Sequence, residues 1–295
     1  MSIEKRATVV SSSVAALLVI IKMSIGIMSG SIAVLASAID SMLDFIVSLF
    51  NYYAINASQK APDESFNFGR NKIEPLAAVI EGTVISLSAL FILFEALTKI
   101  IRPRAMQYMG ESIVVMLISI VITLALVLFL NYVAKKTGNM VIKADALHYK
   151  TDIFSNGAVL LALGLISYTG EQLIDPILGI CIAIYMIYSA IPIIKEGILM
   201  LLDAALDEEH RKNIITLLST NSFINNFHYL TTRESGSHIF ISVHLVFNVS
   251  ISLYDAHLAS DKIEADIINL FDENKRVHIM IHMDPYDDAE INDTL

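Results

Sequence analysis

Two pairs of metal-binding side-chain types lie inside strongly apolar stretches of the sequence. Asp40 and Asp44 form one pair, His148 and Asp152 form the other, and both pairs have i, i+4 spacing. This spacing places the two members of a pair on one face of a helix, one turn apart. If the two helices face each other, three carboxylates and one imidazole converge on one point, which is a four-coordinate site for a small divalent cation.

Each pair also has a structural explanation. An Asp at membrane depth costs roughly 2.5 to 3.5 kcal/mol on insertion scales unless it is paired or coordinated. Hydrogen bonds to Ser37, Ser41 or Asn156, or a position in water at the end of a span, would reduce that cost. The same spacing on two separate helices favours a metal site. One imidazole among oxygen donors favours Zn²⁺, with Cd²⁺, Fe²⁺, Co²⁺ and Mn²⁺ as competitors.

Long apolar segments must position these pairs. The 295-residue chain is 55% hydrophobic and 17% charged, which is too apolar for a soluble globular protein. A helix needs roughly 20 apolar residues to cross a bilayer. We therefore expect six transmembrane helices, at residues 8–28, 32–56, 75–100, 111–134, 146–168 and 174–199.

Basic residues indicate the orientation of these helices. An even number of spans puts both termini on one side, and the positive-inside rule makes that side the cytoplasm. Lys99, Arg102 and Arg104 would lie outside and are exceptions. We expect a multi-pass protein of the inner (cytoplasmic) membrane with cytoplasmic termini. Eight residues support this topology: Lys5, Arg6, Lys60, Arg70, Lys72, Lys135, Lys136 and Lys143.

The C-terminal residues form a separate, acidic region. Residues 207–295 contain 15 acidic and 6 basic residues and seven of the eight histidines. This balance, without a basic stripe, argues against a nucleic acid partner. We expect a six-helix transmembrane domain at 1–206 and a small α+β domain at 207–295. The hydrophobic patterns of the second domain predict the order α-β-β-α-β, at 208–219, 227–234, 237–247, 253–271 and 276–283.

Histidines alternate with apolar residues in two of the expected strands. His238 and His244 alternate with isoleucine, valine and leucine in the second strand, and His278 and His282 do so in the last. Side chains of a strand point alternately to its two faces. Each strand is therefore expected to bury its apolar face and to present imidazoles on the other.

The motifs resemble those of a known family. Six spans, residues 38–44 (AIDSMLD) and residues 145–152 (DALHYKTD) closely resemble the cation diffusion facilitator family, in particular its bacterial zinc and iron efflux branch. Residues 230–236 and 281–285 extend the resemblance over nearly the whole chain. It implies a homodimer in the membrane, whose cytosolic domains have a ferredoxin-like, metallochaperone-like fold. It also implies that the transported ion is bound by Asp40, Asp44, His148 and Asp152.

Two further features near the membrane follow from the resemblance. In this branch the loop after the second span holds an Asp followed three and seven residues later by His, whereas this chain has Asp63, Phe66 and Arg70. We therefore expect a weak or absent loop site at Asp63. Lys72 and Asp203 match a charge pair that the resemblance assigns to bracing the dimer, and a solvated position is the alternative for each.

The tail contains a second set of candidate ligands. A single His on a strand is usually an ordinary surface or core residue, but several ligand-type residues on adjacent elements favour a metal site. His238 and His278 have no counterpart in the family, and we interpret them as surface residues. By the resemblance, the cytosolic metal cluster corresponds to His228, His244, His257, His282 and Asp284.

These features predict a secondary transporter that exports Zn²⁺ or a similar divalent ion from the cytosol in exchange for protons. An empty site with three carboxylates should take up a proton, with His148 as the first candidate carrier and Asp44 as the second. We expect the tail to bind metal, to regulate transport and to dimerise. Glu81 and Glu95 in the third span have no assigned role.

Three alternatives to this prediction need to be considered. An intramembrane metalloprotease would need an HExxH motif, and an ATP-driven pump would need a GxxxxGK[ST] motif; the sequence contains neither. A membrane sensor that binds metal without transporting it has no such requirement and stays an alternative. No organic cofactor is implied, so the expected ligands are divalent metal ions and protons, in contact with membrane lipid.

Overall fold

The computed structural model describes residues 2–29, 32–102, 110–272 and 275–288 of the chain. The chain divides into two compact units, Met1–Ile198 and Leu199–Leu295. Each unit has its own hydrophobic core. The predicted domain boundary after residue 206 lies a few residues beyond this division.

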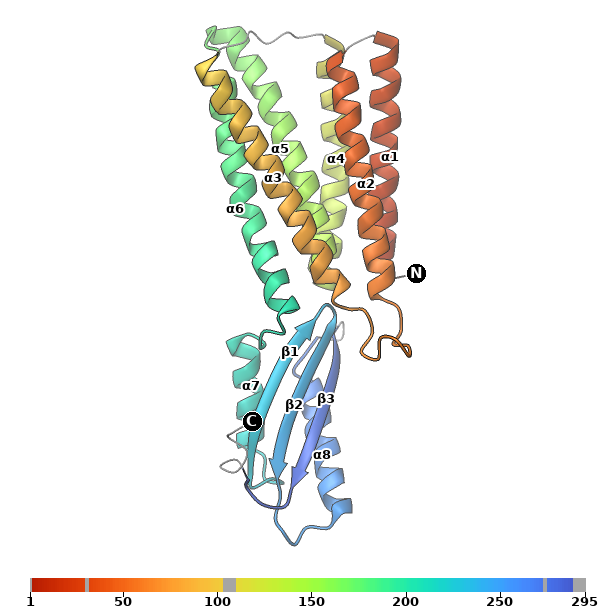
Figure 1. The fold of residues 1–295 in the computed structure, drawn as a ribbon, viewed down its shortest axis with the longest axis vertical. Coiled ribbons are helices and arrows are strands. Elements are labelled where there is room, and N and C mark those ends of the chain that lie inside the picture. Colours follow the sequence, from red (N-terminus) through yellow and green to blue (C-terminus); the bar gives the residue numbers. More distant parts are fainter. Residues whose placement is uncertain (1, 30–31, 103–109, 273–274, 289–295) are drawn as a thin grey trace. The chain divides into compact units, whose positions relative to one another are not determined.

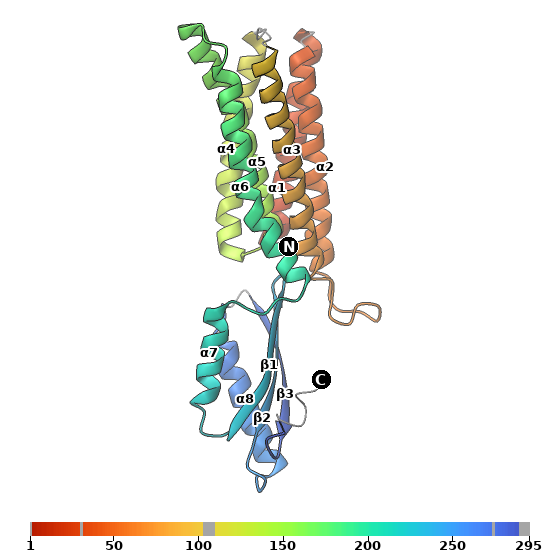
Figure 2. The same cartoon turned by 60° about the vertical axis from the view of Figure 1, so that its left-hand side comes forward.

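Six long helices make up the first unit, and Figures 1 and 2 show them side by side as one bundle. Each contains a segment that is long and apolar enough to cross a membrane. The prediction of six transmembrane helices is confirmed. The helices are α1 (Ile3–Ser29), α2 (Ile32–Ser58), α3 (Ile73–Ile101), α4 (Gly110–Thr137), α5 (Met140–Thr169) and α6 (Ile174–Leu201).

Helix α5 begins at Met140, earlier than the predicted start at residue 146. The difference arises because charged residues interrupt the apolar pattern of its first turns. Two oxygen acceptors fix this end: Asn139 Oδ1 accepts from the backbone N–H of Ile142 at 3.1 Å, and Glu74 Oε1 from that of Met140 at 2.9 Å. Such bonds satisfy N–H groups that have no partner within the helix. The bond to Glu74 fixes the start of α5, the helix that carries His148, against α3.

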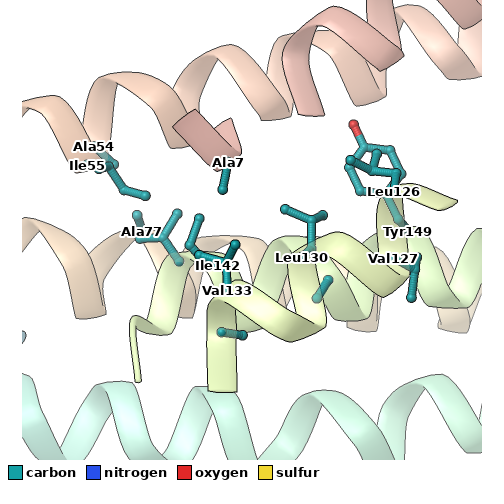
Figure 3. Close-up of a cluster of buried hydrophobic side chains, with 13 residues drawn as sticks. Ala7, Ala54, Ile55, Ala77, Leu126, Val127, Leu130, Val133, Ile142 and Tyr149 are labelled. Atoms are coloured by element: carbon teal, nitrogen blue, oxygen red, sulfur yellow. The ribbon is translucent and has the colours of Figure 1, made fainter. Parts of the chain in front are cut away.

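Apolar side chains from five helices form the core of the first unit (Figure 3). Leu126, Leu130 and Val133 on α4 face Ile142 and Tyr149 on α5, and all five are buried. Many other large apolar side chains of the bundle face outward. This distribution suits helices whose surroundings are lipid, because the bilayer removes the requirement for a polar exterior.

Glycines bring α3 and α6 close together. A Cβ atom added at Gly197 would lie 2.5 Å from Val79 Cγ2 and 3.1 Å from the carbonyl oxygen of Pro75. A Cβ atom at Gly82 would lie 2.8 Å from Ile194 Cγ1. Small residues allow membrane helices to approach closely, and these two positions require them. The contact holds α6 against α3, the helix that carries Glu81.

Lys99, an exception to the positive-inside pattern, has acidic partners in the structure. Its Nζ lies 3.1 Å from Asp175 Oδ2 on α6 and 3.7 Å from Glu95 Oε1 on its own helix. Acidic partners lower the cost of placing a cation here, so Lys99 is weaker evidence on orientation than its charge suggests. Glu95 thereby has a structural partner. Arg104 lies outside the described residues.

The described residues of the second unit form a three-stranded sheet with two helices, and the predicted order α-β-β-α-β is confirmed. Strand β2 lies between its neighbours, antiparallel to β1 and parallel to β3. Buried residues of β2, including Ile241 and Leu245, pack with Ile214 of α7 and Ile263 of α8. The elements are α7 (Glu208–Ser219), β1 (Asn226–Ser235), β2 (His238–Val246), α8 (Leu253–Ile268) and β3 (Arg276–Asp284).

The register of this sheet aligns three histidines in one row. His228 on β1 pairs with His244 on β2, which pairs with His282 on β3. A register shift follows His228, where Tyr229 adopts a positive φ of 52°. Directly opposed residues in a sheet have neighbouring side chains. Strand pairing therefore brings together imidazoles that are far apart in the sequence.

Candidate metal centres

Three of the four predicted ligands in the membrane unit lie together between α2 and α5. His148 Nε2 is 3.1 Å from Asp44 Oδ1 and 3.9 Å from Asp152 Oδ2. One ligand atom from each residue lies within 4.8 Å of the other two. Zinc–ligand bonds of about 2.0–2.2 Å require only small side-chain shifts from this arrangement. The group can therefore hold a divalent cation through two oxygens and one nitrogen.

Asp40, the fourth predicted ligand, is exposed and lies outside this group. Its i, i+4 spacing aligns it with Asp44 on one face of α2. Spacing along one helix does not determine how close the facing helix comes at each level, so alignment alone does not bring Asp40 to His148. The assignment of Asp40 as a ligand stays a prediction.

Sequence analysis missed a lysine beside this group. Lys22 on α1 is only 7% exposed, and its Nζ donates to Ser41 Oγ at 2.7 Å and to the carbonyl oxygen of Ser37 at 3.4 Å, both on α2. A lysine within an apolar span is visible in the sequence, but its partner on another helix is not. Its ammonium places a positive charge near three carboxylates, those of Asp44, Asp152 and Asp40.

The tail holds a second group of ligand atoms, formed by His228, His244, Asp284 and Asp288. His228 Nε2 lies 3.1 Å from Asp288 Oδ1 and 3.4 Å from Asp284 Oδ2, and His244 Nδ1 lies 3.0 Å from Asp284 Oδ2. Both ring nitrogens of His228 and Asp288 Oδ1 are buried. Two imidazoles and two carboxylates suit Zn²⁺. The sequence analysis did not identify Asp288, which follows β3 in a loop.

The other two predicted tail ligands lie apart from this group. His282 is 64% exposed, and its Nε2 contacts the second oxygen of Asp284, Oδ1, at 3.1 Å. It borders the group through that carboxylate. His257 lies on α8, 66% exposed, with Asp261 as an i, i+4 neighbour at 3.8 Å. The structure does not bring His257 to the other ligands, and its role stays a prediction.

His238 and His278 form a separate pair on the sheet. His238 Nδ1 lies 2.8 Å from His278 Nε2, and the rings stack with Phe240, over which Arg233 also lies. Burial lowers the pKa of His238 to about 4, with repulsion from His278 and Arg276 acting in the same direction. With His238 neutral, a single ring N–H can form the hydrogen bond between the two imidazoles. These surface residues therefore have a defined contact that the sequence analysis did not expect.

In the loop after α2, the carboxylate of Asp63 forms an ion pair with Arg70. Arg70 Nη1 lies 2.7 Å from Asp63 Oδ2, and the guanidinium stacks on Phe66. Asp63 Oδ1 accepts from the backbone N–H groups of Ser65 and Phe66. The Arg70 guanidinium holds the pKa of the Asp63 carboxyl below its usual range. A metal ion would have to compete with this fixed positive charge, which is consistent with the expected weak loop site.

Lys72 and Asp203, the members of the predicted charge pair, belong to different units. Asp203 lies in the second unit, where its Oδ1 accepts a hydrogen bond from Arg233 at 2.9 Å. Lys72 immediately precedes α3 in the first unit. Their pairing in a dimer stays a prediction.

Comparisons with known proteins agree with this geometry. A family model described as the cation efflux transmembrane domain matches residues 8–202, and one described as the cation efflux protein cytoplasmic domain matches residues 206–286. The cation-efflux pump FieF of Klebsiella pneumoniae is 38% identical over 280 residues, which cover 95% of this chain and 92% of the relative. Proteins of the same name from Citrobacter koseri and Escherichia coli are 37% and 35% identical over the same shares. The chain therefore belongs to the cation efflux family, whose members are transporters and not enzymes.

Proposed function

We propose that this protein exports a divalent metal ion, preferably Zn²⁺, from the cytosol in exchange for protons. The observation that carries the proposal is the group of Asp44, His148 and Asp152 within helices that can span a membrane. Charged side chains at membrane depth carry a free-energy cost. Binding and release of a transported cation would give these side chains a function that accounts for the cost. The relatives named as cation-efflux pumps support export as the direction.

The mixed donor set supports the preference for zinc. His148 supplies nitrogen, and Asp44 and Asp152 supply oxygen, with Asp40 as the proposed fourth ligand. Zn²⁺ accepts such a set at tetrahedral geometry, whereas ions such as Mn²⁺ favour oxygen alone and higher coordination. Fe²⁺, Cd²⁺ and Co²⁺ remain competitors for the same ligands.

Charge balance supports proton exchange. With Lys22 included, three carboxylates, one ammonium and one divalent ion are formally neutral. Departure of the ion leaves two uncompensated negative charges in a region of low dielectric constant, which favours proton uptake. Protons and metal then compete for one set of ligands, with His148 and Asp44 as carriers. Alternating exposure of this set to the two sides makes the competition an antiport.

We further propose a homodimer in the inner membrane with cytoplasmic termini. The tail group of His228, His244, Asp284 and Asp288 then faces the cytosol and binds exported ions before they enter the membrane. The acidic tails repel each other without metal, so ion binding favours a closed pair of tails. Through its differential affinity for the two states, the ion favours the membrane conformation that goes with closure.

Reconstituted vesicles test this proposal. Purified full-length protein in proteoliposomes should accumulate radioactive zinc when a proton gradient is imposed, and collapse of the gradient by an ionophore should stop accumulation. An excess of Mg²⁺ should not compete. Zinc that binds without accumulating under any gradient would support the sensor alternative and contradict transport. Accumulation that is indifferent to the gradient would support transport and contradict proton exchange.

A further inference from the structure

A second polar group lies between α2, α3 and α5, separate from the metal ligands. Asn51 Nδ2 donates to Glu81 Oε2 at 3.1 Å and to Asp145 Oδ1 at 3.2 Å. All three residues are buried, with exposures of 0%, 2% and 0% for Asn51, Glu81 and Asp145. One amide nitrogen therefore holds two carboxyl groups close together inside the bundle.

This group contains acceptors without donors. Asn51 Oδ1, Glu81 Oε1 and Asp145 Oδ2 are buried and have no hydrogen-bond partner among the residues that the structure describes. A buried unpaired polar atom costs about 1–3 kcal/mol, and more if it is charged. Two neighbouring carboxylates of like charge, away from water, do not both stay ionised. The missing component is a positive charge, and a proton on one carboxyl group supplies both the charge and a donor.

A proton fits this group better than a second metal ion does. The amide of Asn51 presents its nitrogen, not its oxygen, to both carboxyl groups. The group also contains no imidazole or thiolate, the donors that favour zinc. The hydroxyl of Ser11 on α1 is a further neighbour of Asp145.

We propose that Glu81 and Asp145 share an exchangeable proton that leaves when metal binds at Asp44, His148 and Asp152. This inference rests on the proposed proton-coupled export and adds a proton site outside the metal ligands. It gives Glu81 a role that the sequence did not reveal.

The two groups are placed to act on each other. Asp145 precedes His148 by three residues on α5, and Asn51 follows Asp44 by seven residues on α2, so both groups lie along the same helix faces. His148 interacts electrostatically with both Glu81 and Asp145, and Asp44 with Asp145. A divalent ion at His148 adds positive potential, which lowers the proton affinity of the pair. By linkage, proton loss strengthens metal binding to the same extent.

Proton release on metal binding tests the proposal without any membrane gradient. Zinc is titrated into weakly buffered, purified full-length dimer near neutral pH, and released protons are measured with an indicator dye. Glu81→Gln preserves the size of the side chain and an acceptor for Asn51, and it should release fewer protons per zinc than the parent, by up to about one per chain. Asp145→Asn should reduce release in the same direction.

Glu74→Gln is the matched control, because Glu74 is also buried on α3 but already accepts a backbone hydrogen bond from Met140. Its proton release should equal that of the parent. Infrared difference spectra of the parent provide a measurement that needs no variant to fold. The C=O band of a protonated carboxylic acid should disappear when zinc is added, and Glu81→Gln or Asp145→Asn should reduce the change.

Three results would overturn the proposal. They are unchanged proton release in both variants, the absence of a carboxylic acid band in the parent, and the loss of one bound zinc per chain in Glu81→Gln, which would assign the group to metal. Failure of proton-coupled export is a different result. In that case zinc flux of the parent ignores a pH gradient, although proton release in detergent still reports on Glu81 and Asp145.

Discussion

The two candidate metal centres of this protein are assembled in different ways. In the membrane unit, Asp44, His148 and Asp152 meet because helix spacing aligns them and α2 faces α5. In the tail, His228 and His244 meet because β1 and β2 pair in a fixed register. Helix spacing is local, whereas strand register depends on the whole sheet.

The two centres also differ in how their negative charge is compensated. Lys22 lies beside the membrane centre, hydrogen-bonded to Ser41, and compensates part of the charge whether or not an ion is bound. The tail centre places the carboxylates of Asp284 and Asp288 beside the imidazoles of His228 and His244. With Lys22 present, departure of a divalent ion leaves a formal charge of −2 on the membrane centre, in place of −3 for the three carboxylates alone.

The largest expected effect is the loss of a ligand in the membrane centre. Asp44→Ala and Asp152→Ala should each reduce zinc flux more than the roughly 10–100-fold that follows loss of a partner outside the coordination sphere. The remaining ligands cannot complete a tetrahedral site. Flux into proteoliposomes is the measurement, and Glu95→Gln, which alters the ion pair with Lys99, is the control. Normal flux in either Ala variant contradicts the site.

A change of ligand type should alter selectivity more than rate. His148→Asp converts the nitrogen donor into oxygen and should shift the preference from Zn²⁺ toward Mn²⁺, by about tenfold or more in the flux ratio. Competition between the two ions in vesicles measures the ratio. The corresponding change in the tail, His244→Asp, should leave the flux ratio unchanged. An unaltered ion ranking in His148→Asp means that His148 is not a ligand.

Removal of Lys22 should strengthen zinc binding, whereas removal of a ligand should weaken it. Lys22→Met deletes a positive charge and should tighten zinc binding by about tenfold, since a neighbouring charge contributes roughly 1 to 2 kcal/mol at an effective dielectric constant of about 20. Tighter binding should slow release and lower the maximal flux. Lys22→Arg retains the charge and serves as the control. Calorimetry on the full-length protein measures binding, and weaker binding in Lys22→Met contradicts the role of the ammonium.

The tail centre should affect how zinc flux depends on the zinc concentration, without being part of the permeation route. His244→Ala combined with Asp284→Ala removes two of its ligands and should raise the zinc concentration for half-maximal flux several-fold, with maximal flux preserved. His210→Ala is the control, because His210 lies on α7, outside the tail centre, and has Asp207 as its partner. Complete loss of flux in a folded, dimeric double variant places the tail on the permeation route. A zinc dependence identical to that of the parent would show that the tail centre does not regulate transport.

The sequence predicted those features that depend on local periodicity. The six helices, the strand order and the alignment of His148 with Asp152 follow from repeats of about 3.6 and 2 residues. The alternation of His244 with buried Val243 and Leu245 was predicted in the same way and is observed.

Contacts between elements were not predictable from periodicity. The bond between Lys22 and Ser41, and the convergence of Glu81 and Asp145 on Asn51, depend on how helices pack. Asp288 joins the tail centre from a loop that no pattern marks. A polar residue within an apolar span distinguishes Lys22 and Glu81 in the sequence. The sequence does not show which residues they contact.

The smallest expected effect concerns His238 and His278, the pair that lies outside both centres. The pKa of His238 is lowered to about 4, by burial first and then by repulsion from His278 and Arg276. An unfolded chain has an ordinary value near 6.5. Protonation therefore opposes the folded state, so stability is highest above pH 6.5 and declines as the pH falls toward 4. The side chain is half-buried, and solvent screening limits the loss to about 1 kcal/mol.

Replacement of its neighbour should separate one cause of this low pKa from the others. In His278→Gln the repulsion from His278 is absent while burial and the repulsion from Arg276 persist, so the pKa of His238 should rise but stay below 6.5. NMR of histidine ring protons in the full-length protein follows the titration, and His238→Gln identifies its signal. Zinc flux at neutral pH should equal that of the parent in both variants, because both imidazoles lie outside the metal centres. A His238 midpoint near 6.5 in the parent, or no rise in His278→Gln, contradicts the described contact.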